Sequence, residues 1–141
     1  TRDIAELTGS WTHSLANGRT SLTFGGQLTQ EWATQDRPEG DGTFWGVNGE
    51  IDRSFRDSLD GFFWWSYVNE SYDDERPDFS TDPDLLEVRN DDLWNFGGGL
   101  VWGFAPGWSL RPTFEYNWED SSIDELAYSS TELWLTVRKS F

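Results

Sequence analysis

Carboxylates are the most numerous side chains in this chain that could do chemistry. The sequence has 26 Asp and Glu against 10 Lys and Arg, a net charge of -16. Between positions 70 and 92, ten acidic residues have only Arg76 and Arg89 as counter-charges. Carboxylates at such spacing can wrap a hard divalent cation. The groups that could do so are Asp73, Asp74, Glu75 and Asp78, or Asp82 and Asp84. No EF-hand pattern occurs, so a solvated acidic loop without metal is the favoured interpretation, and cation binding stays as its alternative.

Two catalytic arrangements can be drawn from the sequence, and neither has its supporting pattern. His13 is the only histidine, and with Ser10 or Ser14 it could form a Ser-His-acid esterase site. No nucleophile-elbow glycine pattern accompanies it. Glu50 and Asp52 could act as a glycosidase pair, but strand alternation alone places two acids at this spacing. We therefore predict no enzymatic activity, no cofactor and no catalytic residues.

The elements that must position these side chains are strands, because apolar and polar residues alternate with period two. From Trp108 to Trp118 every second residue is apolar, and the residues between are polar. The last dozen residues alternate in the same way and end on an aromatic carboxy terminus. Such a strand has one oily face and one polar face.

Seven candidate strands follow from this reading, separated by connections that alternate in length. The short connections 14–19, 56–60 and 105–107 carry Asn-Gly, Asp-Gly and Pro-Gly pairs. The connections 33–42, 73–92 and 120–129 are longer and acidic, as extracellular loops are relative to periplasmic turns. The expected strands are residues 4–13, 20–32, 43–55, 61–72, 93–104, 108–119 and 130–141.

A sheet with one apolar and one polar face can belong to a soluble sandwich or to a transmembrane barrel, and composition helps to decide between them. Ten Trp, ten Phe and four Tyr accompany a mean hydropathy of -0.69. Trp108 and Trp118 bracket one strand, as aromatic side chains do at the two bilayer interfaces. We therefore predict an all-β, antiparallel, up-and-down transmembrane β-barrel over residues 1–141. The alternative is a soluble β-sandwich that binds carbohydrate on surface tryptophans.

The predicted partners and location follow from the barrel and from the charge. We expect outer-membrane lipid and the barrel-assembly machinery as partners in the outer membrane of a diderm bacterium. The strong negative charge disfavours nucleic acid. The closing strand supplies the expected assembly signal, which consists of Leu133, Leu135, Val137 and Phe141.

The polar face of the predicted barrel would line its lumen. Arg111 and Arg138 are expected to form cross-strand ion pairs with Glu115 and Glu132. Acidic groups outnumber basic ones on this face, which favours cation preference. The expected lumen-lining ionisable residues are Glu31, Glu50, Asp52, Arg111, Glu115, Glu119, Glu132 and Arg138.

Two positions depart from the regular pattern. Residues 62–65 are aromatic on both faces of the fourth strand, so its orientation is ambiguous. Pro112 lies within a strand and lacks a ladder donor, so a bulge or a local loss of pairing is expected there. The small inward residues of the fifth strand leave space or admit bulky neighbours.

Seven strands cannot close an antiparallel barrel, because the first and the last run in the same direction. Single-chain bacterial barrels have even strand numbers. We therefore expect further strands upstream and a larger even-stranded barrel, of which this chain is the carboxy-terminal part. The alternatives are an eighth strand within residues 79–90, or pairing of the edges with another protein.

The last third of the chain resembles a known class of barrels. The shared features are Arg89-Asn90-Asp91-Asp92 before a strand, the Gly107–Pro112 turn exit, Ser121-Ser122-Ile123 with Tyr128, and the terminal TELWLTVRKSF. This segment looks like the carboxy-terminal hairpins of large barrels that follow periplasmic tetratricopeptide repeats, such as surface lipoprotein assembly modifiers and exopolysaccharide-export porins. The resemblance implies a pore or export barrel, although its motifs are common to many barrels and the helical repeat domain is absent here.

Overall fold

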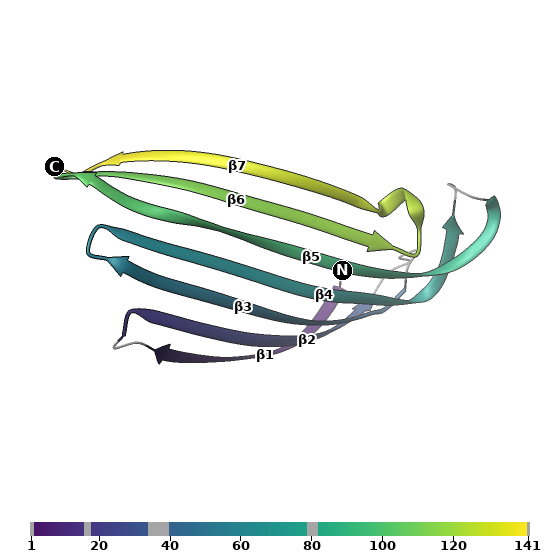
Figure 1. Ribbon diagram of the computed structural model, residues 1–141. Coiled ribbons are helices and arrows are strands. Elements are labelled where there is room, and N and C mark those ends of the chain that lie inside the picture. The colour runs from purple at the N-terminus through teal and green to yellow at the C-terminus, as the bar shows by residue number, and fades with distance from the viewer. Residues whose placement is uncertain (1, 16–17, 34–39, 79–81, 141) are drawn as a thin grey trace.

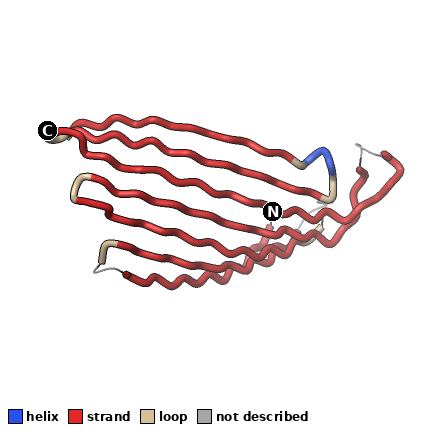
Figure 2. Tube along the Cα trace, in the orientation of Figure 1, coloured by secondary structure: helices blue, strands red, loops and turns tan. Residues whose placement is uncertain are grey.

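The computed structural model describes residues 2–15, 18–33, 40–78 and 82–140. They form one sheet of seven antiparallel strands, each paired with the next along the chain (Figure 1). Strands make up nearly the whole trace in Figure 2. The predicted all-β, up-and-down order of seven strands is thus confirmed. The strands are β1 (Arg2–Leu15), β2 (Thr20–Ala33), β3 (Gly42–Arg56), β4 (Leu59–Asp78), β5 (Asp82–Ala105), β6 (Trp108–Ser121) and β7 (Tyr128–Lys139).

The register of the sheet carries the sequence alternation across all seven strands. Trp94 lies opposite Trp118 and Gly98 lies opposite Phe114, so these four positions share one face. We call this the apolar face and the opposite one the polar face. The apolar face includes Leu28, Trp45, Ile51, Phe63, Trp94, Trp102, Phe114 and Leu133, and the polar face includes Thr23, Glu50, Ser66, Asn95, Glu115 and Glu132.

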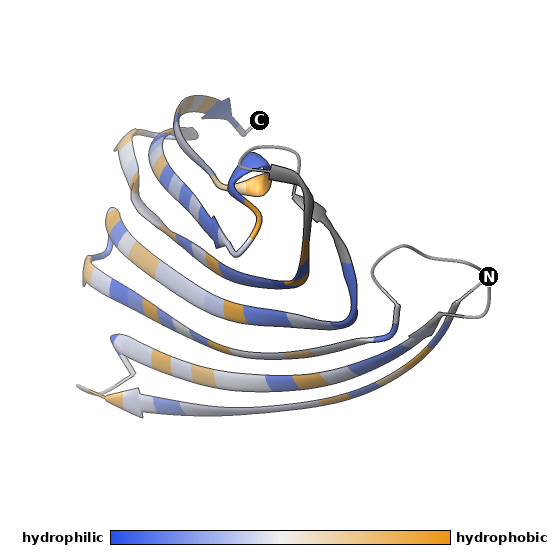
Figure 3. Cartoon of the chain, turned by 90° about the vertical axis from the view of Figure 1, so that its right-hand side faces the viewer, coloured by the Kyte–Doolittle hydropathy of each residue, from blue (hydrophilic) through white to orange (hydrophobic). Residues whose placement is uncertain are grey.

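The apolar face of the sheet exposes large hydrophobic side chains. On the apolar face Leu7 is 72% exposed, Leu133 77% and Leu135 67%. On the polar face Glu31 is only 3% exposed. Among the described residues no second layer covers either face. On the polar face Glu115 and Asn117 are half-buried, whereas Glu50 and Glu132 are exposed. The sheet as a whole is curled, as Figure 3 shows.

The hairpin of β4 and β5 extends well past the other strands and corrects one prediction. The acidic segment 73–92 was expected to be a loop, but β4 continues to Asp78 and β5 starts at Asp82. Glu75 pairs with Val88 and Arg76 with Glu87, after a register shift beyond Ser71. The far part of this hairpin projects at the right of Figure 1. Pairing that resumes at Glu75 satisfies backbone groups there despite the low β-propensity of the acidic residues.

The other connections between strands differ less from the prediction. The stretch 82–90, considered as part of an eighth strand, belongs to β5, and residues 79–81 lie outside the described ranges. The connection after β6 holds a single 3-10 turn, η1 (Asp124–Leu126), and a fully buried Ile123. The reversal between β3 and β4 falls before Leu59, so the Asp60-Gly61 pair lies in β4 and not in the turn.

Pro112 interrupts the ladder on one side only. Pairing of β5 with β6 is recorded at Gly99–Thr113 and resumes in the same register at Trp102–Leu110. On the other side Pro112 itself is in register with Leu135. The predicted local loss of pairing is therefore confirmed, without a bulge, because the ring removes one donor and leaves the strand extended.

The glycines of β5 make room for the rings of β4. A Cβ at Gly97 would lie 2.5 Å from both the Phe114 carbonyl oxygen and the Trp64 ring, and a Cβ at Gly99 would lie 2.8 Å from the Phe62 ring. The small inward residues thus admit bulky neighbours, one of the two predicted outcomes.

Gly97→Val is expected to lower the free energy of unfolding by about 1–3 kcal/mol, because the added atoms overpack against Trp64 and a backbone carbonyl. The urea midpoint of unfolding, compared with the unchanged chain, measures this. Gly9→Val is the matched control, since a Cβ at Gly9 meets nothing within 4 Å. Equal midpoints for the two variants would contradict the close packing at Gly97.

Candidate functional site

The polar face is the part of the sheet that gathers chemistry-bearing side chains. The register places one residue of each strand in a row that crosses the whole sheet. This row contains Thr12, Thr23, Glu50, Trp64, Gly97, Glu115 and Glu132. The next row toward the long connections is uncharged and consists of Ser10, Gly25, Asn48, Ser66, Asn95, Asn117 and Ser130.

All eight residues predicted to line the lumen lie on this polar face, at different levels. Glu50, Glu115 and Glu132 share the charged row, and Asp52 lies one row nearer the short turns. Arg111 and Arg138 lie beyond Asp52 toward the short turns. Glu31 and Glu119 lie at the opposite end, where the long connections begin.

The predicted ion pairs of Arg111 and Arg138 with Glu115 and Glu132 are wrong. Among the described residues, no salt bridge joins these groups. Glu115 lies directly opposite Glu132 and accepts a hydrogen bond from Asn95 Nδ2 at 2.8 Å. The Arg111 guanidinium instead lies 4.5 Å from the Phe62 ring centroid. Arg111 contacts the Phe62 ring and not a carboxylate, because the ring lies over Gly99, beside Arg111.

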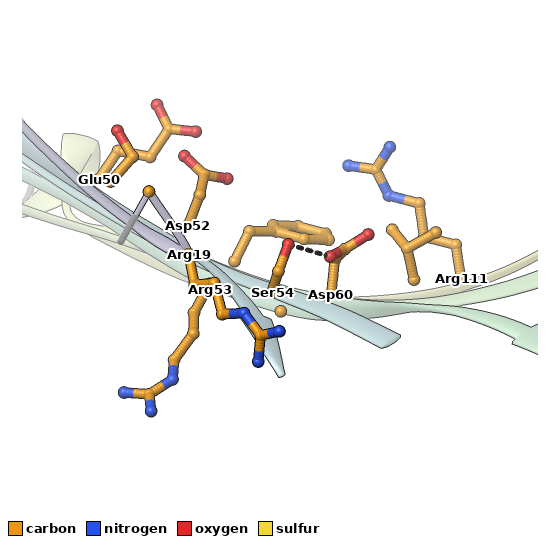
Figure 4. A pocket seen from close by; sticks show the side chains of 12 residues that line it. Arg19, Glu50, Asp52, Arg53, Ser54, Asp60 and Arg111 are labelled. Carbon is orange, nitrogen blue, oxygen red and sulfur yellow. Dashed lines mark hydrogen bonds between the residues drawn. The ribbon is translucent and has the colours of Figure 1, made fainter. Parts of the chain in front are cut away.

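A shallow pocket of about 440 Å³ lies at the short-turn end of the sheet (Figure 4). Glu50, Asp52, Asp60 and Arg111 extend from one side of the sheet in this view, whereas Arg19 and Arg53 extend from the other. Ser54 donates a hydrogen bond to Asp60 at 2.6 Å. Three carboxylates and three arginines therefore line the pocket, and of the arginines Arg111 lies on the polar side with the carboxylates.

A second cluster lies at the other end of the polar face, where the long hairpin begins. Asp91 is fully buried and accepts from Arg89 Nε and from Ser121 Oγ, each at 2.5 Å. The Arg89 guanidinium lies 4.9 Å from the Tyr72 ring centroid and 4.0 Å from a Glu119 oxygen. This cluster links β4, β5 and β6 and fixes the base of the hairpin.

Glu119 belongs to this cluster and lies one residue beyond Trp118, toward the long connections. Burial raises the pKa of its carboxyl above the usual value. The carboxylates of Asp91 and Glu70 add to the rise, and Arg89 opposes it.

Aromatic side chains on the apolar face gather at two levels. At one level Tyr67 lies 5.2 Å from Trp45 and 4.6 Å from Trp94 between ring centroids, and its hydroxyl donates to Asp92 at 2.5 Å. At the other level Phe104 lies 5.8 Å from Trp102 and 6.4 Å from Trp108. Between these levels the register places Leu, Ile and Phe side chains such as Ile51, Phe114 and Leu133, together with Trp65 and Tyr116 next to the first level.

The residues considered for catalysis do not assemble. His13 is on the apolar face and stacks on Trp11 at 5.3 Å, whereas Ser10 and Ser14 fall on the polar face. Strand alternation therefore separates the histidine from both hydroxyls.

Of the acidic residues considered for metal binding, the structure describes the side chains of Asp73, Asp74 and Glu75. The described residues contain no group of three or more His, Asp or Glu placed to hold a metal ion. The side chains of Asp78, Asp82 and Asp84 lie outside the described part of the structure.

Sequence reasoning missed the roles of Trp64 and Asp91. Residues 62–65 are all aromatic, so alternation could not show which rings face the polar side. The pairing of Trp64 with Gly97 shows this. Asp91 was assigned to an acidic loop, so nothing in the sequence indicated its burial. Leu133, Leu135 and Val137 of the expected assembly signal are exposed on the apolar face, and Phe141 lies outside the described residues.

No protein-family model matches this chain, and comparisons with curated proteins and with solved structures find no significant match. Among the described residues, no helix is long and apolar enough to cross a membrane.

Proposed function

We propose that this chain forms part of the wall of an outer-membrane β-barrel, a pore or export channel in a diderm bacterium. The observation that carries the proposal is a single seven-stranded sheet whose large apolar side chains are exposed on one face, while the ionisable side chains lie on the other. In the proposal lipid covers the apolar face and the polar face lines a lumen.

The two aromatic levels support the same assignment. Trp108 and Trp118 are ten residues apart on β6. That is roughly 33 Å along a strand, or about 23 Å across a bilayer at a 45° tilt, close to the apolar band of about 25 Å. Tyr and Trp settle at bilayer interfaces because their polar tips reach water. The Tyr67 hydroxyl bonded to Asp92 has this geometry.

The two edges of the sheet are β1 and β7, which run in the same direction. An antiparallel barrel built on them is completed by an odd number of further strands, from the same polypeptide or another protein. In this proposal the short turns face the periplasm, and the acidic β4–β5 hairpin projects outside the cell.

Detergent dependence tests the proposed function. The chain is expected to need detergent or lipid to stay dispersed, and to migrate differently on a gel before and after boiling. A carbohydrate-binding sandwich would be dispersed in plain buffer and show no such heat-dependent migration, and that result would overturn the proposal.

The charged row gives a prediction for conduction. Pores containing this chain are expected to prefer cations in reversal-potential measurements, because Glu50, Glu115 and Glu132 face the lumen. The triple Glu→Gln variant at these positions is expected to lose much of that preference.

Glu125→Gln in η1 is the control for the conduction measurement, because it removes an exposed carboxylate away from the charged row. An anion-selective pore, or an equal change in selectivity in the control, would refute the assignment.

A further inference from the structure

The Trp64 ring is a fixed platform on the polar face. Its Nε1 donates to Asn95 Oδ1 at 2.9 Å, and it lies over Gly97 of the neighbouring strand. It is parallel to the Phe62 ring within 8°, at 5.8 Å between centroids. With one side of the ring against the sheet, the other side faces away from it.

The neighbouring Phe62 ring already has a cation over its face. Arg111 places its guanidinium 4.5 Å from the Phe62 centroid. Among the described residues no cation occupies the equivalent position over Trp64. Because the two rings are parallel, the Arg111–Phe62 contact is an internal example of what the Trp64 ring can bind.

The charges around Trp64 favour the same ligand. Glu50 lies directly opposite on β3, and Glu115 lies two strands away in the same row, about 10 Å at the usual strand spacing. Asn95 joins the two parts of the site, because it accepts from Trp64 and donates to Glu115 at 2.8 Å. A cation over the ring would thus have a carboxylate on either side, whereas an anion would be repelled.

We propose that Trp64, Glu50 and Glu115 form a binding subsite for organic cations of the guanidinium type. The ring stacks on the planar cation, and the two carboxylates accept its hydrogen bonds. The inference rests on the proposed function, in which this subsite lies in the lumen and binds cationic solutes selectively. The binding itself requires only the folded sheet.

The test uses the chain folded in detergent micelles and two matched probes. N-acetyl-argininamide carries a guanidinium, and N-acetyl-citrullinamide has the same shape with a neutral urea group. The readout is the NMR signal of the Trp64 indole N–H, assigned by its loss in Trp64→Leu. We expect a saturable shift with the arginine probe and none with the citrulline probe.

Variants separate the subsite from general attraction to an acidic protein. Trp64→Leu is expected to weaken binding of the arginine probe about 5- to 30-fold, measured by calorimetry, because the cation–π contact is lost. Glu50→Gln with Glu115→Gln is expected to weaken it as well. Trp102→Leu, on the apolar face, is the matched control and is expected to leave it unchanged.

The outcomes distinguish this inference from the proposed function. Equal shifts with both probes would overturn the cation subsite, as would unchanged affinity in Trp64→Leu. Binding that persists in a chain without detergent dependence would refute the pore and leave the subsite standing. A cation-selective pore without the Trp64 shift would support the pore and refute the subsite.

Discussion

Asp91→Ala is expected to lower the free energy of unfolding by about 3–5 kcal/mol, the usual cost of breaking a buried ion pair. Asp91 is fully buried, with Arg89 Nε and Ser121 Oγ each 2.5 Å from its carboxylate. Alanine deprives the half-buried guanidinium of its nearest carboxylate and the serine hydroxyl of its acceptor. The measurement is urea unfolding of the chain in detergent micelles.

The same change is expected to loosen the base of the β4–β5 hairpin, because the cluster links three strands there. Limited proteolysis should then cut within residues 73–92 sooner than in the unchanged chain. Asp120→Ala is the control, since Asp120 lies near the same end of β6 but is exposed. Similar destabilisation by the two substitutions would mean that burial of Asp91 contributes little.

Leu133→Arg is expected to destabilise the sheet in lipid vesicles by about 2–4 kcal/mol, the cost of a cation near the midplane of a barrel wall. Leu133 is 77% exposed and lies opposite Phe114, midway between the two aromatic levels. In water the same substitution would place a charge on an open surface, at little cost. The urea midpoint in vesicles, compared with the unchanged chain, gives the difference.

Glu132→Arg is the matched control for this substitution. The residue is adjacent on β7, exposed, and on the polar face. We expect it to shift the midpoint far less than Leu133→Arg, although it changes the charge more. Equal effects at both positions would contradict the assignment of the two faces to lipid and lumen.

The strands and their faces could be predicted from the sequence because each is a local property. Alternation from Trp108 to Trp118 fixes the face of every residue in β6, and the tight turns fix the neighbour of each strand. The predicted strand order was therefore confirmed, as was the effect of Pro112. A one-residue slip would have exchanged the two faces, so the pattern specifies the register strongly.

The long hairpin and the clusters could not be predicted, because they depend on contacts between strands. Acidic residues at 73–75 have poor β-propensity, yet β4 continues through them. The backbone N–H of Asp73 donates to Asp41 O, and pairing with β5 resumes at Glu75. Arg111 had a carboxylate within reach in the sequence pattern, but the Phe62 ring lies nearer in the fold. Which of two nearby partners a side chain takes is decided by register and ring orientation.

The most direct test of the central claim is a nitroxide scan along β7, which is feasible because the chain has no cysteine of its own. Single cysteines at positions 131–137 are spin-labelled, and the protein is reconstituted in vesicles. Their collision rates are then measured with oxygen, which concentrates in lipid, and with a water-soluble nickel complex. The account predicts oxygen maxima at Leu133, Leu135 and Val137, and nickel maxima at Glu132, Trp134 and Thr136. Equal access of the nickel complex to both sets, or exclusion of both reagents from Leu133 and Leu135, would contradict it.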